Sequence, residues 1–118
     1  MSYDKNNIFA KILRGEIPCK KIYENDNVLA FHDINPQKKL HVLVIPKGEY
    51  VDLDDFNNKA SDKEIVELSK AVTHVANLIG AKDKGYRSLT NIGNDGGQEV
   101  PHLHFHIFAG EKIGKMVS

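Results

Sequence analysis

The sequence predicts an α+β fold, with a five-stranded antiparallel sheet, one long helix and one short helix. Three observations predict it. Five short segments carry the apolar or alternating pattern of strands, one long segment has the apolar period of a helix, and turn-forming residues separate neighbouring strands. At 118 residues the chain has the length of one domain, so we expect residues 1–118 to form a single domain with the sheet covered on one face.

The first predicted element is a short helix, and two strands follow it. The apolar residues of this helix recur at helical spacing, at Ile8, Phe9, Ile12 and Leu13. Gly15 and Pro18 end the pattern. Residues 20–24 and 28–33 then predict strands that meet around Asn25-Asp26-Asn27, because these residue types tolerate tight turns.

The middle of the chain predicts a central strand and the long helix. Residues 40–45 form an apolar, β-branched run that is typical of a strand inside a sheet. Residues 61–79 predict the helix, because Ser61 and Glu64 make a capping box and Gly80 supplies a C-terminal cap. The apolar stripe of this helix contains Ile65, Leu68, Val72, Val75, Ala76 and Ile79.

The last two strands are predicted at residues 86–91 and 102–109. Between them, residues 93–99 are too rich in glycine for a regular element, but they suit a close approach of the backbone to a ligand. Pro101 has no amide hydrogen to donate, so it fits only where the last strand begins or at a sheet edge.

Composition and charge exclude several classes of partner. The 16 basic and 16 acidic residues cancel, so nothing favours bulk attraction to nucleic acid or to a membrane surface. Residues 1–7 lack the apolar run of a signal peptide, and no stretch approaches the ~20 apolar residues of a spanning helix. The lone Cys19 cannot form an internal disulfide, and we interpret it as a buried or bystander thiol. We therefore expect a cytoplasmic protein.

Three histidines alternate with apolar residues in the last predicted strand. The period of two places His102, His104 and His106 on one outer face, and it sends Leu103, Phe105 and Ile107 toward the core. Imidazoles with an unperturbed pKa of about 6.5 suit a face that handles protons, phosphate or metal. Successive rings would stand ~7 Å apart, which favours a linear site in which one ring attacks and its neighbours hold charge or transfer protons.

His41, in the third predicted strand, is a candidate fourth member of this cluster. A strand beside the last one would bring it within hydrogen-bond reach of His102 or His104. A nucleophilic imidazole must be neutral at the attacking nitrogen and needs a partner on the other nitrogen, while the glycine loop supplies amide donors to a phosphate. The residues leave one alternative open, a zinc site, because His-x-His on a strand is a known zinc geometry for which His41 is the best third ligand.

The motif His-Leu-His-Phe-His-Ile-Phe at residues 102–108 is similar to the signature of the histidine triad superfamily. Other motifs, in order and nearly end to end, resemble its Hint branch, and the chain is most similar to bacterial members of that branch. These motifs cover residues 8–12, 16–18, 30–36, 41–47, 85–87 and 96–100.

This resemblance implies a purine nucleoside phosphoramidase that needs no cofactor or metal. Such enzymes hydrolyse the P–N bond of adenosine or guanosine 5′-phosphoramidates and release the nucleotide and an amine. By the same resemblance, His104 attacks the α-phosphorus and forms a nucleotidyl-histidine that water then cleaves. His106 would contact the phosphate and help the leaving group, while His102 and His41 would support the ring network.

The resemblance also implies the nucleotide-binding residues and a twofold homodimer with one continuous sheet. Asp33 would take the ribose hydroxyls. The base would lie against Ile8, Phe9, Ile12, Phe31, His32 and Ile34. The phosphate would lie against Asn91, Gly97, Gln98, Glu99 and Val100, the last two through their amides.

Departures from the family pattern leave other functions open. Glu99 stands where animal members carry Ser, and the Cys-x-x-Cys of zinc-bearing relatives is missing at residues 8–11, which disfavours metal. The alternatives are a dinucleoside polyphosphate hydrolase like the Fhit branch, a non-catalytic nucleotide-binding or scaffold protein, and a zinc-binding regulator.

Overall fold

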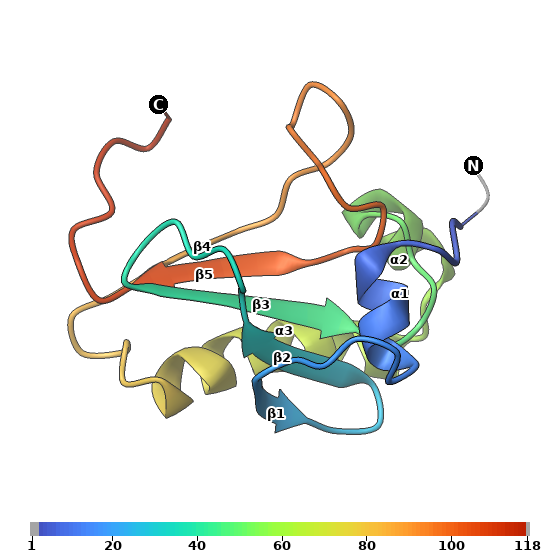
Figure 1. Ribbon diagram of the computed structural model, residues 1–118, viewed down its shortest axis with the longest axis horizontal. Helices are drawn as coiled ribbons and strands as arrows, with labels where there is room; N and C mark the ends of the chain where they lie inside the picture. The colour runs from blue at the N-terminus through green and yellow to red at the C-terminus, as the bar shows by residue number, and fades with distance from the viewer. Residues whose placement is uncertain (1–2, 118) are drawn as a thin grey trace.

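The computed structural model describes residues 3–117 and confirms the predicted fold class (Figure 1). One antiparallel sheet has the strand order β1-β2-β3-β5-β4, so β3 is central, as its apolar run predicts. The elements in chain order are α1 (Ile8–Leu13), β1 (Lys21–Glu24), β2 (Val28–His32), β3 (Leu40–Pro46), α2 (Leu53–Lys59), α3 (Asp62–Leu78), β4 (Arg87–Leu89) and β5 (Phe105–Ala109).

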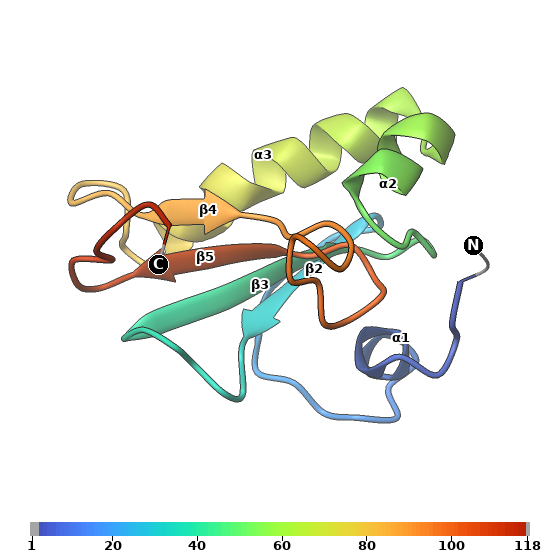
Figure 2. The same ribbon diagram turned by 90° about the horizontal axis from the view of Figure 1, so that it is seen from above.

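The register of β3 against its neighbours defines the two faces of the sheet. Residues directly opposite each other in an antiparallel pair point to the same face. Val42 is opposite Ile107, and both are buried in the core beneath α3. Leu43 is opposite Phe31 on β2 and His106 on β5, so these three side chains share the other face. Figure 2 shows α2 and α3 on one side of the sheet and α1 on the other.

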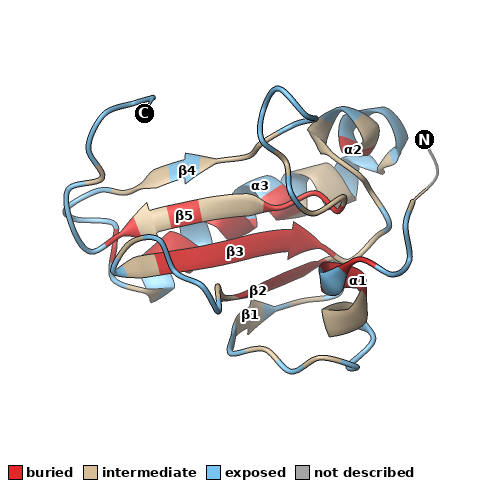
Figure 3. Cartoon of the chain, turned by 45° about the horizontal axis from the view of Figure 1, so that its top comes forward, coloured by how far each residue is buried: buried red, intermediate tan, exposed pale blue. Residues whose placement is uncertain are grey.

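The main core lies between the sheet and α3. The burial pattern of β3 in Figure 3 is continuous because this strand is covered on both faces. The start of α3 is the predicted capping box: Ser61 Oγ accepts from the Glu64 amide at 3.2 Å, and Glu64 Oε1 accepts from the Ser61 amide at 3.1 Å. The fully buried side chains of this core include Val28, Ala30, Val42, Val44, Val75, Ala76 and Ile107.

A smaller core forms on the opposite face, so the expectation of a sheet covered on one face only is wrong. Phe9 on α1 packs there against residues of β2 and β3. Helix α1 is short and covers only part of this face, which leaves the histidine-bearing part of β5 beside an open space. This second core contains Phe9, Leu29, Phe31, Leu43 and Ile45.

The structure has one helix that the sequence does not predict, and β4 and β5 are shorter than predicted. Helix α2 was not predicted, because its seven residues bury only Phe56 and show no apolar stripe; its signal is Asp52, which caps the helix by accepting from the Asp55 amide. Strand β5 begins at Phe105 and not at His102. Within residues 3–117, no helix is long and apolar enough to cross a membrane.

Candidate active site

The three alternating histidines do not share one exposed strand face. His102 and His104 precede β5 and are 0% and 5% exposed, whereas His106 lies on β5 and is half-buried. The expected outer face is therefore wrong, because Phe9 of α1 packs edge-on against both of these rings, at centroid distances of 6.2 Å to His102 and 4.9 Å to His104. The apolar part of the alternation is confirmed, since Leu103 and Ile107 are both buried in the core under α3.

His104 carries the geometry of a nucleophile. Its Nδ1 lies 2.7 Å from the main-chain carbonyl oxygen of His102. A carbonyl oxygen only accepts, so Nδ1 holds the proton and Nε2 keeps its lone pair. The ring lines the pocket and packs edge-on against Phe9 at a centroid distance of 4.9 Å. Burial lowers the pKa of His104, so the ring is neutral at neutral pH.

His41 hydrogen-bonds to His106, not to His102 or His104 as the sequence analysis expected. The Gln37 amide donates to His41 Nδ1 at 3.2 Å, so the proton of His41 is on Nε2. This Nε2–H donates to His106 Nδ1 at 2.9 Å. The strand register explains why His41 pairs with His106. His41 is opposite Phe108, and His106 lies two residues before Phe108 on the same face of the sheet. His106 therefore carries its own proton on Nε2 and presents it on a ring that lines the pocket.

Burial keeps the pair formed by His41 and His106 neutral. It lowers the pKa of His106 to about 4, and the neighbouring His104 and His41 add to this effect. Burial also lowers the pKa of His41. The negative charge of Asp33, whose Oδ2 lies 3.4 Å from His41 Nε2, partly offsets this by raising the pKa. The site thus offers a lone pair on one ring and a proton donor on another.

One cluster among the described residues has the ligand types of a cation site. Asp33, His41 and His106 each offer a ligand atom, and these atoms lie within 4.8 Å of one another. This set differs from the His-x-His pair weighed in the sequence analysis. Both nitrogens of His41 already have protein partners, so a metal would have to replace the hydrogen bond between His41 and His106.

His102 lies behind the site and does not line the pocket. Its Nε2 donates to the Pro46 carbonyl at 2.9 Å, and its Nδ1 accepts from the Tyr3 hydroxyl at 2.5 Å. Burial lowers the pKa of His102 to about 4. With both nitrogens engaged and no charge, His102 has no free atom for the chemistry and can only support the other rings.

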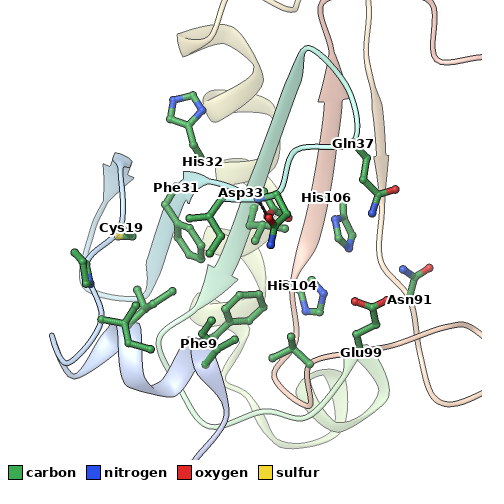
Figure 4. Close-up of a pocket in the computed structure, with 18 of the residues that line it drawn as sticks. Phe9, Cys19, Phe31, His32, Asp33, Gln37, Asn91, Glu99, His104 and His106 are labelled. Atoms are coloured by element: carbon green, nitrogen blue, oxygen red, sulfur yellow. Dashed lines mark hydrogen bonds between the residues drawn. The ribbon is translucent and has the colours of Figure 1, made fainter.

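A pocket of about 290 Å³ opens beside His104 and His106, between α1, the sheet and the glycine-rich loop (Figure 4). Its inner wall is apolar, and its other side carries the histidines, Asp33 and Glu99. Figure 4 shows the Glu99 carboxylate directed into the pocket on the side of His104. Predicted site residues that line the pocket are Ile8, Phe9, Ile12, Phe31, His32, Asp33, Ile34, Asn91, Gly97, Glu99, Val100, His104 and His106.

Sequence reasoning missed part of the pocket wall. Cys19 lines it and is partly buried against the smaller core; burial raises the pKa of its thiol, which keeps it protonated. The signal for this wall was weak, because the segment between α1 and β1 has no regular pattern. The missed lining residues are Ile17, Pro18, Cys19, Asn35, Gln37 and Leu43.

Gln98 does not hold phosphate from this position, which corrects the sequence prediction. Its Nε2 donates to the carbonyls of Val51 and Val100, at 2.7 and 3.0 Å, and its Oε1 accepts from the Gly93 amide at 3.0 Å. The side chain therefore braces the loop. The amides of Gly97 and Gln98 are also used inside the loop, bonding to the carbonyls of Asn94 and Gly93. Within residues 3–117, the amides of Glu99 and Val100 donate to no protein acceptor.

Comparison with known proteins identifies the family of this fold and site. The model of the HIT domain family matches residues 14–113, so the chain belongs to the HIT family. A 13.2 kDa HIT-like protein of Azospirillum brasilense is 59% identical over 117 residues, which cover 99% of this chain and 96% of that protein. A HIT-like protein of Helicobacter pylori is 48% identical, over 90% of this chain and 98% of that protein.

Solved structures agree with this assignment. A histidine triad protein from Clostridium difficile is 43% identical with a TM-score of 0.83, and the match covers 97% of this chain and 98% of that one. A protein described as a HIT family hydrolase from Clostridium thermocellum is 36% identical with a TM-score of 0.88, covering 98% and 99% of the two chains. The superfamily that the motifs predict is confirmed, while the Hint branch within it stays a prediction.

Proposed function

We propose that this protein is a purine nucleoside phosphoramidase that works through a covalent nucleotidyl-histidine. The observation that carries the proposal is the pair of opposite roles in one pocket. His104 Nε2 has a free lone pair because its Nδ1 is bound to a carbonyl, and His106 Nε2 has a proton because its Nδ1 accepts from His41. P–N cleavage needs both a nucleophile for phosphorus and a donor for the departing nitrogen.

In the first step, His104 Nε2 forms a bond to the α-phosphorus. The P–N bond breaks, its electron pair stays on nitrogen, and the amine takes the Nε2 proton of His106; the negative charge left on His106 balances the positive charge on the phosphorylated His104 ring, and His41 still donates to His106 Nδ1. In the second step, water attacks phosphorus and gives one proton to His106 Nε2, while the bond to His104 breaks and its electron pair returns to His104 Nε2. The free amides of Glu99 and Val100 are the proposed donors to the phosphate oxygens.

The nucleoside would occupy the apolar side of the pocket. Phe9 and Phe31 form a wall suited to a purine ring. Asp33, at the end of β2, has one carboxylate oxygen bound to the Asn35 amide, and the other faces His41. We place the ribose hydroxyls beside this carboxylate.

The experiment incubates the protein with adenosine 5′-phosphoramidate in the presence of a chelator and measures AMP release. We expect turnover, a nucleotidyl adduct in quenched samples by mass spectrometry, and a loss of roughly 10³-fold or more in kcat for His104→Ala with AMP binding retained. His74→Ala is the matched control, because His74 is exposed on α3, on the opposite side of the sheet. Full activity in His104→Ala would overturn the mechanism.

Parallel assays separate the competing functions. Faster cleavage of a dinucleoside polyphosphate than of the phosphoramidate would favour a Fhit-like hydrolase. AMP binding without turnover of either substrate would favour a nucleotide-binding protein. Turnover that stops in chelator and returns with zinc would implicate the cluster of Asp33, His41 and His106 as a metal site.

The proposal includes a homodimer joined through the edge of the sheet. Strand β4 lies at one edge, where an unpaired strand offers free N–H and C=O groups to a second copy. Light scattering should give twice the 13.2 kDa chain mass, and a monomer mass at micromolar concentration would refute the dimer.

A further inference from the structure

We propose that Tyr3 is a positioning residue of the histidine cluster: its hydroxyl holds the His102 ring and, through the main-chain carbonyl of that residue, fixes the orientation of His104. The inference rests on the proposed function, since it assigns Tyr3 an effect on the nucleophile of that reaction. Tyr3 precedes the residues that match the family model, which begin at residue 14, and it does not line the pocket.

The contact between Tyr3 and His102 is direct and partly buried. The Tyr3 hydroxyl lies 2.5 Å from His102 Nδ1, and the two rings meet edge-on at a centroid distance of 5.6 Å. His102 is 0% exposed, and its Nε2 already donates to the Pro46 carbonyl. The hydroxyl is thus the donor that satisfies the second nitrogen, and without it a buried acceptor would be left unpaired.

The main chain at His102 lies outside the sheet ladder, so its own ring contacts help to hold it in place. Strand β5 begins three residues later, and the main-chain anchors next to His102 are the Leu103 amide, which donates to the Tyr50 carbonyl at 2.8 Å, and the His104 carbonyl, which accepts from Thr90 Oγ1 at 2.7 Å. The His102 carbonyl is the acceptor that keeps the proton of His104 on Nδ1. A shift of the His102 ring therefore moves the group that directs the His104 lone pair into the pocket.

The segment that carries Tyr3 is itself fastened to α1. The main-chain amide and the side-chain Nδ2 of Asn7 both donate to the Asp4 carbonyl, at 3.2 and 2.7 Å. Arg14 Nη1, just after the helix, donates to the Lys5 carbonyl at 2.8 Å. These hydrogen bonds fix the N-terminal segment, and with it the Tyr3 hydroxyl that binds His102.

The test compares Tyr3→Phe with Tyr23→Phe in the full chain carrying its own N-terminal residues. Both variants lose one hydrogen-bonded hydroxyl and keep the ring, but the Tyr23 hydroxyl on β1 accepts from Asn25, away from the cluster. In ¹⁵N NMR of the ring nitrogens, we expect Tyr3→Phe to move the His102 Nδ1 signal toward that of an unbonded nitrogen. We also expect His104 to lose its single Nδ1–H tautomer. For phosphoramidate cleavage, kcat should fall roughly tenfold, as losses of supporting partners do, with KM changed less than about twofold. Tyr23→Phe should change neither readout.

An unchanged His104 tautomer and an unchanged kcat in Tyr3→Phe would overturn the role of Tyr3. If the melting temperature fell in that variant with neither change, the hydroxyl would have a purely structural effect. The NMR measurement needs no turnover. If the wild-type protein cleaves no phosphoramidate, the proposed function fails, and the His104 tautomer in Tyr3→Phe still decides whether Tyr3 positions that ring.

Discussion

The chemistry of the site is set by which nitrogen of each histidine holds the proton. His104 and His106 have opposite arrangements although they are two residues apart, because one bonds to a carbonyl and the other to a second imidazole. Burial lowers the pKa of both rings, and the negative charge of nearby carboxylates partly raises it again. The carboxylates Asp33 and Glu99 favour the protonated form of His104. Their charge therefore raises the pH at which the nucleophile becomes available, against the larger effect of burial.

At the scale of single residues, Glu99→Gln is expected to shift the acid limb of the profile of kcat/KM against pH to lower pH. Removing the negative charge removes a stabiliser of protonated His104, so the pKa of that ring falls further and the neutral form persists to lower pH. The measurement is kcat/KM against pH for both proteins. Asp95→Asn, an exposed position in the same loop, is the control and should leave the limb in place. A shift toward higher pH would contradict the electrostatic argument.

At the scale of elements, the sheet and the glycine-rich loop together form the site. Pairing of β3 with β5 brings His41 to His106 across 65 positions of sequence. The loop before β5 is braced by Gln98 and turns at Gly93 and Gly97, which have φ values of 68° and 77°. The free amides of Glu99 and Val100 follow directly, so their position depends on the shape of the loop.

Gly96→Ala tests this dependence. A Cβ at this position would lie 2.3 Å from the main-chain oxygen of Ile92, so the loop backbone has to move. We expect kcat/KM for the phosphoramidate to fall at least about tenfold, because small misplacements of binding groups are costly, while the melting temperature changes little since the loop is exposed. Asp95→Ala adds no atom at the crowded point and serves as the control. Wild-type kinetics in Gly96→Ala would show that the loop does not hold the phosphate.

At the scale of the whole molecule, the buried histidines link stability to pH. His102 and His106 have folded pKa values of about 4, against about 6.5 in an unfolded chain. The unfolded state therefore binds more protons between these values. Their contribution to stability is complete above pH 6.5 and is lost as the pH falls toward 4.

The melting temperature should accordingly decrease as the pH falls from 7 to 5. This window isolates the histidines, because the carboxylates with lowered pKa values, such as Glu24 at about 2, begin to lose their contribution only near the unfolded value of about 4.3. Calorimetry at several pH values measures the effect. A melting temperature that stays constant from pH 7 to 5 would show that the rings protonate as readily in the fold as in the unfolded chain.

Much of the architecture could be predicted from local pattern. The apolar run of β3 predicts its central place, Ser61 and Glu64 predict the start of α3, and the alternation around Leu103 and Ile107 predicts their burial. These features follow from the sequence by itself, because periodicity and capping act over a few neighbouring residues. The histidine motif likewise determined the family.

Tertiary structure alone decided the arrangement within the site. Packing of Phe9 against His102 and His104 helps to bury both rings, the strand register brings His41 to His106, and the Gln98 side chain hydrogen-bonds within its loop. Tyr3 reaches His102 across 99 positions of sequence. Such contacts join segments that no local pattern connects, and they determine where each imidazole carries its proton. The sequence determines which histidines are present, whereas the tertiary hydrogen bonds determine which ring nitrogen keeps a free lone pair.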